Sequence, residues 1–292
     1  MQNCGLVLAL AEIVSIAILI IWSLSTTLER RLSVLSGRSR ASIIIAAAGL
    51  IPIVAIFAFN SSFIGSYAIL ASVISGGFFT LGTLLYYKSL ETEQVSNTAP
   101  TGLLQALPLI AFGVLALGEQ ISAFQICGAA LMTFGVLLAS TTRGSALNRK
   151  LLPAALANVS WAVYWIFASF AINLSGQFAA PILLSRIVSV TLALVVFGIF
   201  FRHHVLKLKR AGNTIALIAM FGITAGVLDG LGNALFAFAT HINALHIASI
   251  FETPMLLLIA LFGYLFYKER LTHLQKIGMA VAFAGALVIA IF

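Results

Sequence analysis

The chain has 292 residues, of which 61% are hydrophobic and only 8% are charged. Because a soluble domain carries about 25% charged residues, this composition excludes a soluble protein and predicts a multi-pass membrane protein. The 16 Lys and Arg residues outnumber the 8 Asp and Glu residues. We expect that excess in short loops between apolar segments, so it does not indicate a nucleic-acid partner.

Ten apolar segments are long enough to cross a bilayer, whose core needs about 20 apolar residues per helix. In chain order they span residues 6–28, 41–60, 67–88, 95–117, 121–141, 151–173, 178–201, 214–240, 245–267 and 271–292. The predicted fold class is therefore an all-α integral membrane protein with ten transmembrane helices. We expect two five-helix units, residues 1–143 and 150–292.

Residues 75–140 and 225–290 repeat one pattern without a gap, 150 positions apart. The repeat aligns Gly76 with Gly226, Gly82 with Gly232, Gly128 with Gly278, Gly135 with Gly285 and Glu119 with Glu269. Five helices is an odd number, so the second unit enters the membrane from the opposite side. The sequence therefore predicts inverted repeats related by a pseudo-two-fold axis in the membrane plane. We assign the two aligned glutamates, which lie at helix junctions, to structure or gating.

The positive charges predict an orientation. Of the 16 Lys and Arg residues, all but Arg186 follow odd-numbered predicted helices: Arg30, Arg31, Arg38, Arg40, Lys88, Arg143, Arg149, Lys150, Arg202, Lys207, Lys209, Arg210, Lys268, Arg270 and Lys276. Basic loops stay in the cytoplasm. We therefore expect both termini to lie outside, with the protein in the plasma (inner) membrane.

Four charged residues lie well inside predicted helices: Glu12, Arg186, Asp229 and Glu252. An ionised group is costly in hydrocarbon, so each should face protein or a water-filled cavity. At 1.5 Å of rise per residue, Glu12, Arg186 and Glu252 lie at a similar depth, about 10 Å from the outer ends of their helices. We expect Glu252 or Glu12 to pair with Arg186, either at a functional site or only to hold helices together.

Asp229 and Asn233 are four residues apart and share one face of the predicted helix 214–240. Small residues around them leave room for a ligand or for a close helix; these are Gly226, Gly230 and Gly232. We predict that both polar side chains line a cavity. The alternative is a side-chain hydrogen bond within the helix.

Glu252 lies two residues before Pro254. A proline removes a backbone donor and predicts a broken or bent helix, which is a common way to build a transporter site. Acidic groups inside membranes often carry protons, so Glu252 is a candidate for proton coupling. The alternative is a carboxyl group that stays protonated or pairs with an arginine.

The predicted helix 151–173 contains a cluster of aromatic and polar residues. Asn158, Trp161 and Trp165 fall on one face, with Tyr164 beside it. Rings with polar edges are suited to line a cavity for amphipathic metabolites, although the same pattern is also typical of helix packing. Asn97 and Gln105 in the segment 95–117 are further candidates for the cavity.

Three stretches of the second repeat together resemble one known family. They are GVLDGLGNALFAFA at 226–239, ETPMLLLIALFGYLFYKERLT at 252–272 and GMAVAFAGALVIA at 278–290. They resemble the EamA-type, ten-helix branch of the drug/metabolite transporter superfamily. The resemblance implies a carrier with a central cavity between helices 1–4 and 6–9, and with helices 5 and 10 as braces. Family members usually keep both termini in the cytoplasm, whereas the charges of this chain predict the opposite.

The stretch LALAEIVSIAIL, which contains Glu12, resembles the first helix of the small multidrug resistance proteins, relatives in the same superfamily. The acid in that helix binds cations and protons, so the resemblance makes Glu12 a second candidate for ion coupling. The alternative is an acid near the outer interface or one paired with Arg186.

These features predict a secondary active transporter, an exporter of small metabolites such as amino acids, that works by alternating access. Its partners would be a small-molecule substrate, membrane lipid and protons, in a monomer or a homodimer, with no cofactor, metal or nucleic acid. The alternative is a carrier for lipid-linked or nucleotide-linked sugars, which Arg186 as the sole cation inside the helices argues against. An intramembrane enzyme is a further alternative, but HExxH and GxSxG are missing, and Asp229, the only Asp, excludes a two-aspartate protease.

Overall fold

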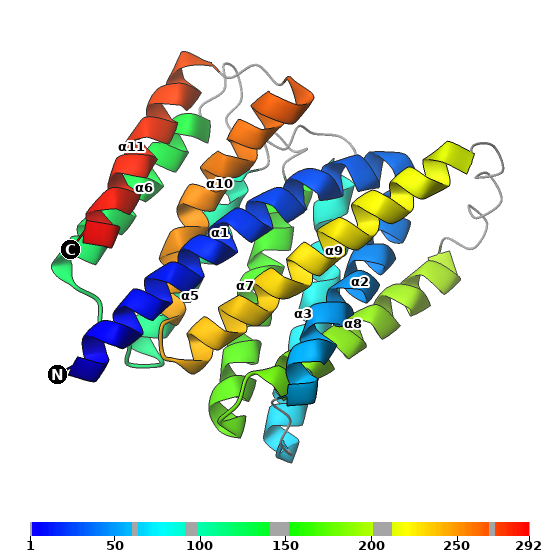
Figure 1. Cartoon of the computed structure of the whole chain (residues 1–292), viewed down its shortest axis with the longest axis horizontal. Helices are drawn as coiled ribbons and strands as arrows, with labels where there is room; N and C mark the ends of the chain where they lie inside the picture. Colours follow the sequence, from blue (N-terminus) through cyan, green and yellow to red (C-terminus); the bar gives the residue numbers. More distant parts are fainter. Residues whose placement is uncertain are drawn as a thin grey trace.

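The computed structural model describes residues 2–59, 64–90, 99–140, 152–200, 212–268 and 272–291. Within these ranges the chain forms ten α-helices and one short 3-10 helix, packed as a bundle (Figure 1). The elements are α1 (Gln2–Ser36), α2 (Arg38–Phe59), α3 (Ser66–Leu90), η1 (Ala99–Gly102), α5 (Leu103–Leu115), α6 (Ala123–Ser140), α7 (Leu152–Ser175), α8 (Ala179–Phe200), α9 (Gly212–His241), α10 (Leu245–Tyr267) and α11 (His273–Ile291).

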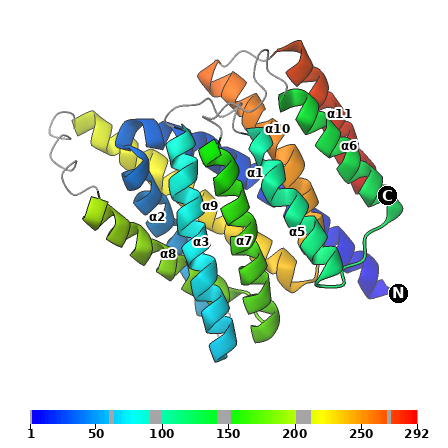
Figure 2. The same ribbon diagram turned by 180° about the vertical axis from the view of Figure 1, so that it is seen from behind.

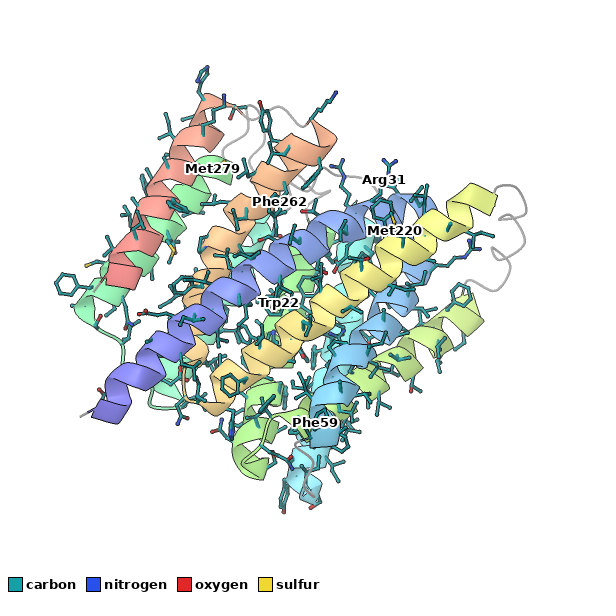
Figure 3. The ribbon with its side chains drawn as sticks, in the orientation of Figure 1. Trp22, Arg31, Phe59, Met220, Phe262 and Met279 are labelled. Atoms are coloured by element: carbon teal, nitrogen blue, oxygen red, sulfur yellow. The ribbon has the colours of Figure 1, made fainter. Side chains whose placement is uncertain are left out.

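The all-helical membrane fold predicted from the sequence is confirmed. Each of the ten predicted segments overlaps one α-helix of the described residues, and seven of these helices are long and apolar enough to cross a membrane. The apolar stretches of α5, α6 and α11 are shorter. Large apolar side chains are exposed on the outside of the bundle (Figure 3): Phe59 is 90% exposed and Met220 is 54% exposed. Such exposure is expected for surfaces that meet lipid.

The first helix departs from the predicted boundaries. We expected it to end at residue 28, but α1 continues to Ser36, about 12 Å farther at 1.5 Å per residue. The added turns are held by packing, because Leu32 and Ser33 are buried. Gly37, at φ +76°, then turns the chain directly into α2. The stretch we treated as a basic loop is therefore mostly helix.

The helices pack in a pattern that repeats between the two halves. α1 lies against α9 and α10, and its counterpart α7 lies against α3 and α5. Likewise α2 packs on α9 as α8 packs on α3, and α6 pairs with its own counterpart α11. The two ends of the chain lie on the same side of the molecule (Figures 1 and 2). This exchange of partners is what a pseudo-two-fold axis between the repeats requires.

Glycines that the repeat aligns occupy matching close contacts. A methyl group on Gly82 of α3 would collide with the indole ring of Trp161, and one on Gly232 of α9 would collide with Trp22. Trp22 on α1 and Trp161 on α7 are therefore counterparts in the two halves. Small residues let the large rings reach the middle of the bundle.

Several sequence expectations concern residues outside the described ranges. These are Asn97, the glutamate Glu269, and the basic residues Arg143, Arg149, Lys150, Arg202, Lys207, Lys209, Arg210 and Arg270. The orientation of the chain in its membrane stays a prediction.

Candidate functional site

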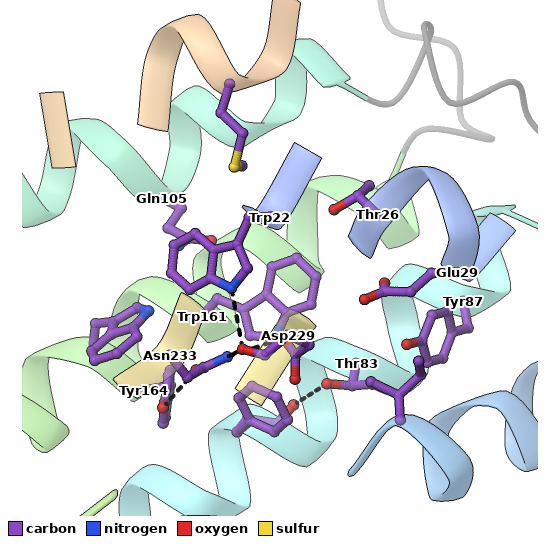
Figure 4. A pocket seen from close by; sticks show the side chains of 14 residues that line it. Trp22, Thr26, Glu29, Thr83, Tyr87, Gln105, Trp161, Tyr164, Asp229 and Asn233 are labelled. Carbon is purple, nitrogen blue, oxygen red and sulfur yellow. Dashed lines mark hydrogen bonds between the residues drawn. The ribbon is translucent and has the colours of Figure 1, made fainter. Parts of the chain in front are cut away.

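A cavity of about 80 Å³ lies between the two halves, near the middle of the bundle (Figure 4). It has room for several water molecules. Seven helices contribute to this central cavity, which is lined by Trp22, Thr26, Glu29, Ile45, Phe79, Thr83, Tyr87, Gln105, Trp161, Tyr164, Trp165, Asp229, Asn233 and Met255. Six of the residues that we predicted for the cavity are among them: Asp229, Asn233, Trp161, Tyr164, Trp165 and Gln105.

Asp229, which lines the central cavity, belongs to a buried ion pair. Nη2 of Arg186 on α8 donates a hydrogen bond of 2.7 Å to Oδ2 of Asp229 on α9. The Arg186 guanidinium also lies over the ring of Phe79, 4.1 Å from its centroid. Our expectation that Glu252 or Glu12 would pair with Arg186 is therefore wrong. Depth along a helix suggested those partners, but the rotation of α9 turns Asp229 toward α8.

Asn233 connects the acid to the aromatic wall. Its Nδ2 donates to the Asp229 carbonyl at 2.8 Å and to the Asp229 carboxylate at 3.0 Å. Its Oδ1 accepts a hydrogen bond from the Tyr164 hydroxyl at 3.0 Å. The hydrogen bond within the helix and the position at the cavity therefore both occur. The carboxylate of Asp229 is fully engaged by Arg186 and Asn233.

The aromatic residues form a continuous wall. The ring centroids of Tyr164 and Trp165 are 4.6 Å apart, and Trp165 lies 4.2 Å from Phe236. Trp22 of the opposite half stacks on the same Phe236 at 5.4 Å. Sequence reasoning missed Trp22.

Four other candidate site residues are not among those that line the cavity: Asn158, Arg186, Glu12 and Glu252. Asn158 instead donates to Thr101 Oγ1 at 2.9 Å and to the Ala154 carbonyl at 2.8 Å. This arrangement ties α7 to η1.

Glu252 lies behind the cavity wall. Its Oε1 accepts a hydrogen bond of 2.8 Å from Nε2 of Gln105, which does line the cavity. Its other oxygen, Oε2, is buried and has no hydrogen-bond partner in the described residues. The adjacent helix is not broken: α10 runs without interruption through Pro254, so the predicted break is wrong. A bend there stays a prediction.

Glu29 is a second lining residue that sequence reasoning missed. It lines the cavity and is only 7% exposed. We had placed it in a loop because Arg30 and Arg31 follow it and mark the end of the apolar run. The signal available was its spacing: Trp22, Ser25, Glu29 and Leu32 recur every three or four residues along one buried face of α1.

At the start of α10, the Glu119 carboxylate links the two halves of the bundle. Glu119 Oε1 accepts the backbone N–H of Leu245 at 2.8 Å, and its Oε2 accepts the backbone N–H of His246 at 2.8 Å. The His246 ring nitrogen Nδ1 lies 2.9 Å from the same Oε2. A carboxylate at a helix N-terminus satisfies amide groups that have no partner within the helix. Glu119 thus joins the α5–α6 connection of one half to α10 of the other.

Comparison with known proteins gives the chain a family. The model of the EamA-like transporter family matches residues 9–141 and again residues 149–291. No curated protein matches the chain. A solved structure described only as the crystal structure of a protein has a TM-score of 0.70 at 15% identity, with 96% of each chain covered. That likeness concerns the fold alone. The two family matches together span nearly the whole chain, which therefore belongs to the EamA-like transporter family within the drug/metabolite transporters.

Proposed function

We propose that the protein is a secondary active transporter that exports small metabolites by alternating access. The observation that carries the proposal is the central cavity, which lies between two pseudo-symmetric halves and is lined by aromatic rings and buried polar groups. Carriers of this architecture bind substrate near the middle of the membrane and rock one half against the other. The family supports transport, and the cavity supports a small amphipathic substrate.

The cavity lining supports an inward-facing state. Lining residues extend toward the helix ends that carry basic side chains: Glu29 lies seven residues before the end of α1, and Tyr87 three before the end of α3. Toward the opposite ends, the buried side chains of Ile172, Phe236 and Leu245 fill the space. If the basic ends face the cytoplasm, substrate enters from inside, as export requires.

Glu252 is our first candidate for proton coupling and Glu12 the second. Glu252 is 4% exposed and reaches the cavity only through Gln105. Substrate that contacts Gln105 can therefore change the protonation of Glu252 without contacting Glu252 itself. Glu252→Gln should abolish the effect of a pH gradient while leaving exchange measurable, and Glu12→Gln tests the second candidate in the same way.

The test is counterflow in proteoliposomes. Vesicles loaded with an unlabelled amino acid, amine or sugar are diluted into the labelled compound, with and without a pH gradient. We expect accumulation above that of empty liposomes for at least one class. The matched control variant is Phe59→Ala, whose side chain is 90% exposed on the lipid-facing surface. Accumulation equal to that of empty liposomes for every class would refute the transporter function.

A variant test addresses the site itself. Asp229→Asn disrupts the ion pair at the cavity wall, and Trp165→Ala removes the largest fully buried ring. Both variants should reduce exchange strongly, whereas the control Phe59→Ala should leave exchange unchanged. Full exchange in Asp229→Asn and Trp165→Ala would show that the central cavity is not the substrate site.

A further inference from the structure

The central cavity carries one carboxylate more than its cations can balance. Asp229 is paired with Arg186 at 2.7 Å, so these two charges cancel. Glu29 is the second acid of the wall, and within the described residues it forms no ion pair. Two carboxylates against one guanidinium leave the Glu29 carboxyl group without a cation to balance its ionised form.

The partners of Glu29 are neutral. Ser25 Oγ lies 2.9 Å from Glu29 Oε1, but it also lies 2.8 Å from the Ala225 carbonyl, and its single proton serves only one of them. Tyr87 lies beside Glu29 in the cavity wall and is a second hydroxyl partner of its carboxyl group (Figure 4). The ionised form of a carboxyl group that is 93% buried and held only by hydroxyl groups is costly, and a cation beside it would stabilise that form.

The rest of the wall is suited to an apolar group attached to a cation. Trp22, Trp161 and Tyr164 present aromatic rings to the same space as Glu29. Such rings attract a nearby cation through their negative faces and take up apolar surface.

No arginine or lysine is among the described residues that line the cavity. Arg186 is 2% exposed, is not among the lining residues, and already bonds Asp229. The carboxylate of a zwitterion would therefore lie near Glu29 and Asp229 without a cation of its own, which is unfavourable in a site of low dielectric constant.

The excess charge is confined to one half. Counting seven residues on from the paired tryptophans, Trp22 and Trp161, gives Glu29 on α1 but Ala168 on α7. Glu29 therefore has no acidic counterpart in the second half, and this one carboxylate can pair with one cationic group.

We propose that the central cavity binds an organic monocation, an amine attached to an aromatic or apolar group, with its ammonium group at Glu29. This inference rests on the proposed transport function and gives the class of its substrate. It favours amines over the amino acids expected from the sequence.

Three probes that share a phenyl ring and a short chain test the proposal: 2-phenylethylamine, phenylalanine and 3-phenylpropionate. They differ in being a cation, a zwitterion and an anion at neutral pH. In counterflow with the wild-type protein, we expect 2-phenylethylamine to exchange at least about tenfold faster than the other two. Glu29→Gln should remove this preference, and Glu29→Asp should retain part of it.

The outcomes are distinguishable from failure of the transport function. Faster exchange of phenylalanine or 3-phenylpropionate, or exchange of other compounds but of none of the three probes, overturns the amine site while transport stands. An unchanged preference in folded Glu29→Gln also overturns it. If Glu29→Gln does not fold, the comparison of the three probes on the wild-type protein still decides.

Discussion

The ion pair between Arg186 and Asp229 allows a quantitative test of the structure. Its side chains are only 2% and 13% exposed, so removing one partner leaves the other charge in a poorly hydrated site. Breaking a buried pair in this way costs about 3–5 kcal/mol. We expect Asp229→Asn to lower the free energy of unfolding by an amount in this range. Arg186→Met should cost less, because Asp229 borders the cavity and is the better hydrated partner.

The double variant is the decisive measurement. Removing both charges leaves no isolated ion, and exchanging a whole buried pair for uncharged groups is often nearly neutral. Arg186→Met with Asp229→Asn should therefore cost less than the sum of the single variants, by at least about 1 kcal/mol. Equilibrium unfolding in mixed micelles measures each free energy. Losses that add to within about 0.5 kcal/mol, as for independent sites, would refute a direct pair.

Three further predictions test packing, gating and orientation. In α3, Gly76→Ala should lower the melting temperature, because its Cβ would lie 2.9 Å from the Cβ of Val188 on α8. The matched control Gly77→Ala, whose Cβ would have nothing within 4 Å, should leave the melting temperature unchanged or raise it slightly. Equal melting temperatures for the two variants would contradict the packing of α3 on α8. Glu119→Gln should weaken the joint with Leu245 and His246, cost about 1–3 kcal/mol, and increase labelling of a cysteine placed at Leu245 by an impermeant thiol reagent. Labelling no greater than in the same cysteine variant with Glu119 intact would show that Glu119 does not hold this joint. A tag at the C-terminus should be accessible from outside intact cells; access only after lysis would reverse the predicted topology.

The asymmetry between the repeats bears on mechanism. Positions that the repeat conserves, such as Gly82 and Gly232, shape the contacts between helices in both halves. The charged groups of the cavity follow no such rule, since Asp229 aligns with Phe79. Both of these residues nevertheless contact Arg186, one by an ion pair and the other by its ring. We infer that a symmetric scaffold carries an asymmetric site.

Much of the architecture could be read from the sequence because its signals are local. Apolar length predicts a membrane helix, and all ten predicted segments overlap helices of the described residues. The glycine spacing revealed the repeat, and five helices per half implied its inversion. The sequence identified Asp229, Asn233 and the aromatic cluster of α7, because polar groups inside a membrane helix must face other protein groups or a cavity.

The partners of those residues depended on the tertiary structure. Depth along a helix supplies one coordinate, and on that basis Arg186 was matched with Glu252 or Glu12; the rotation of α9 against α8 selected Asp229 instead. The predicted boundary placed Glu29 just beyond the first helix. In the structure α1 extends past Glu29, because Leu32 and Ser33 are buried against the bundle. Sequence determined which segments enter the membrane, because insertion depends on each segment's own hydrophobicity. The cavity and its charge balance were decided only by helix rotation and contact, because they arise from side chains far apart in the chain.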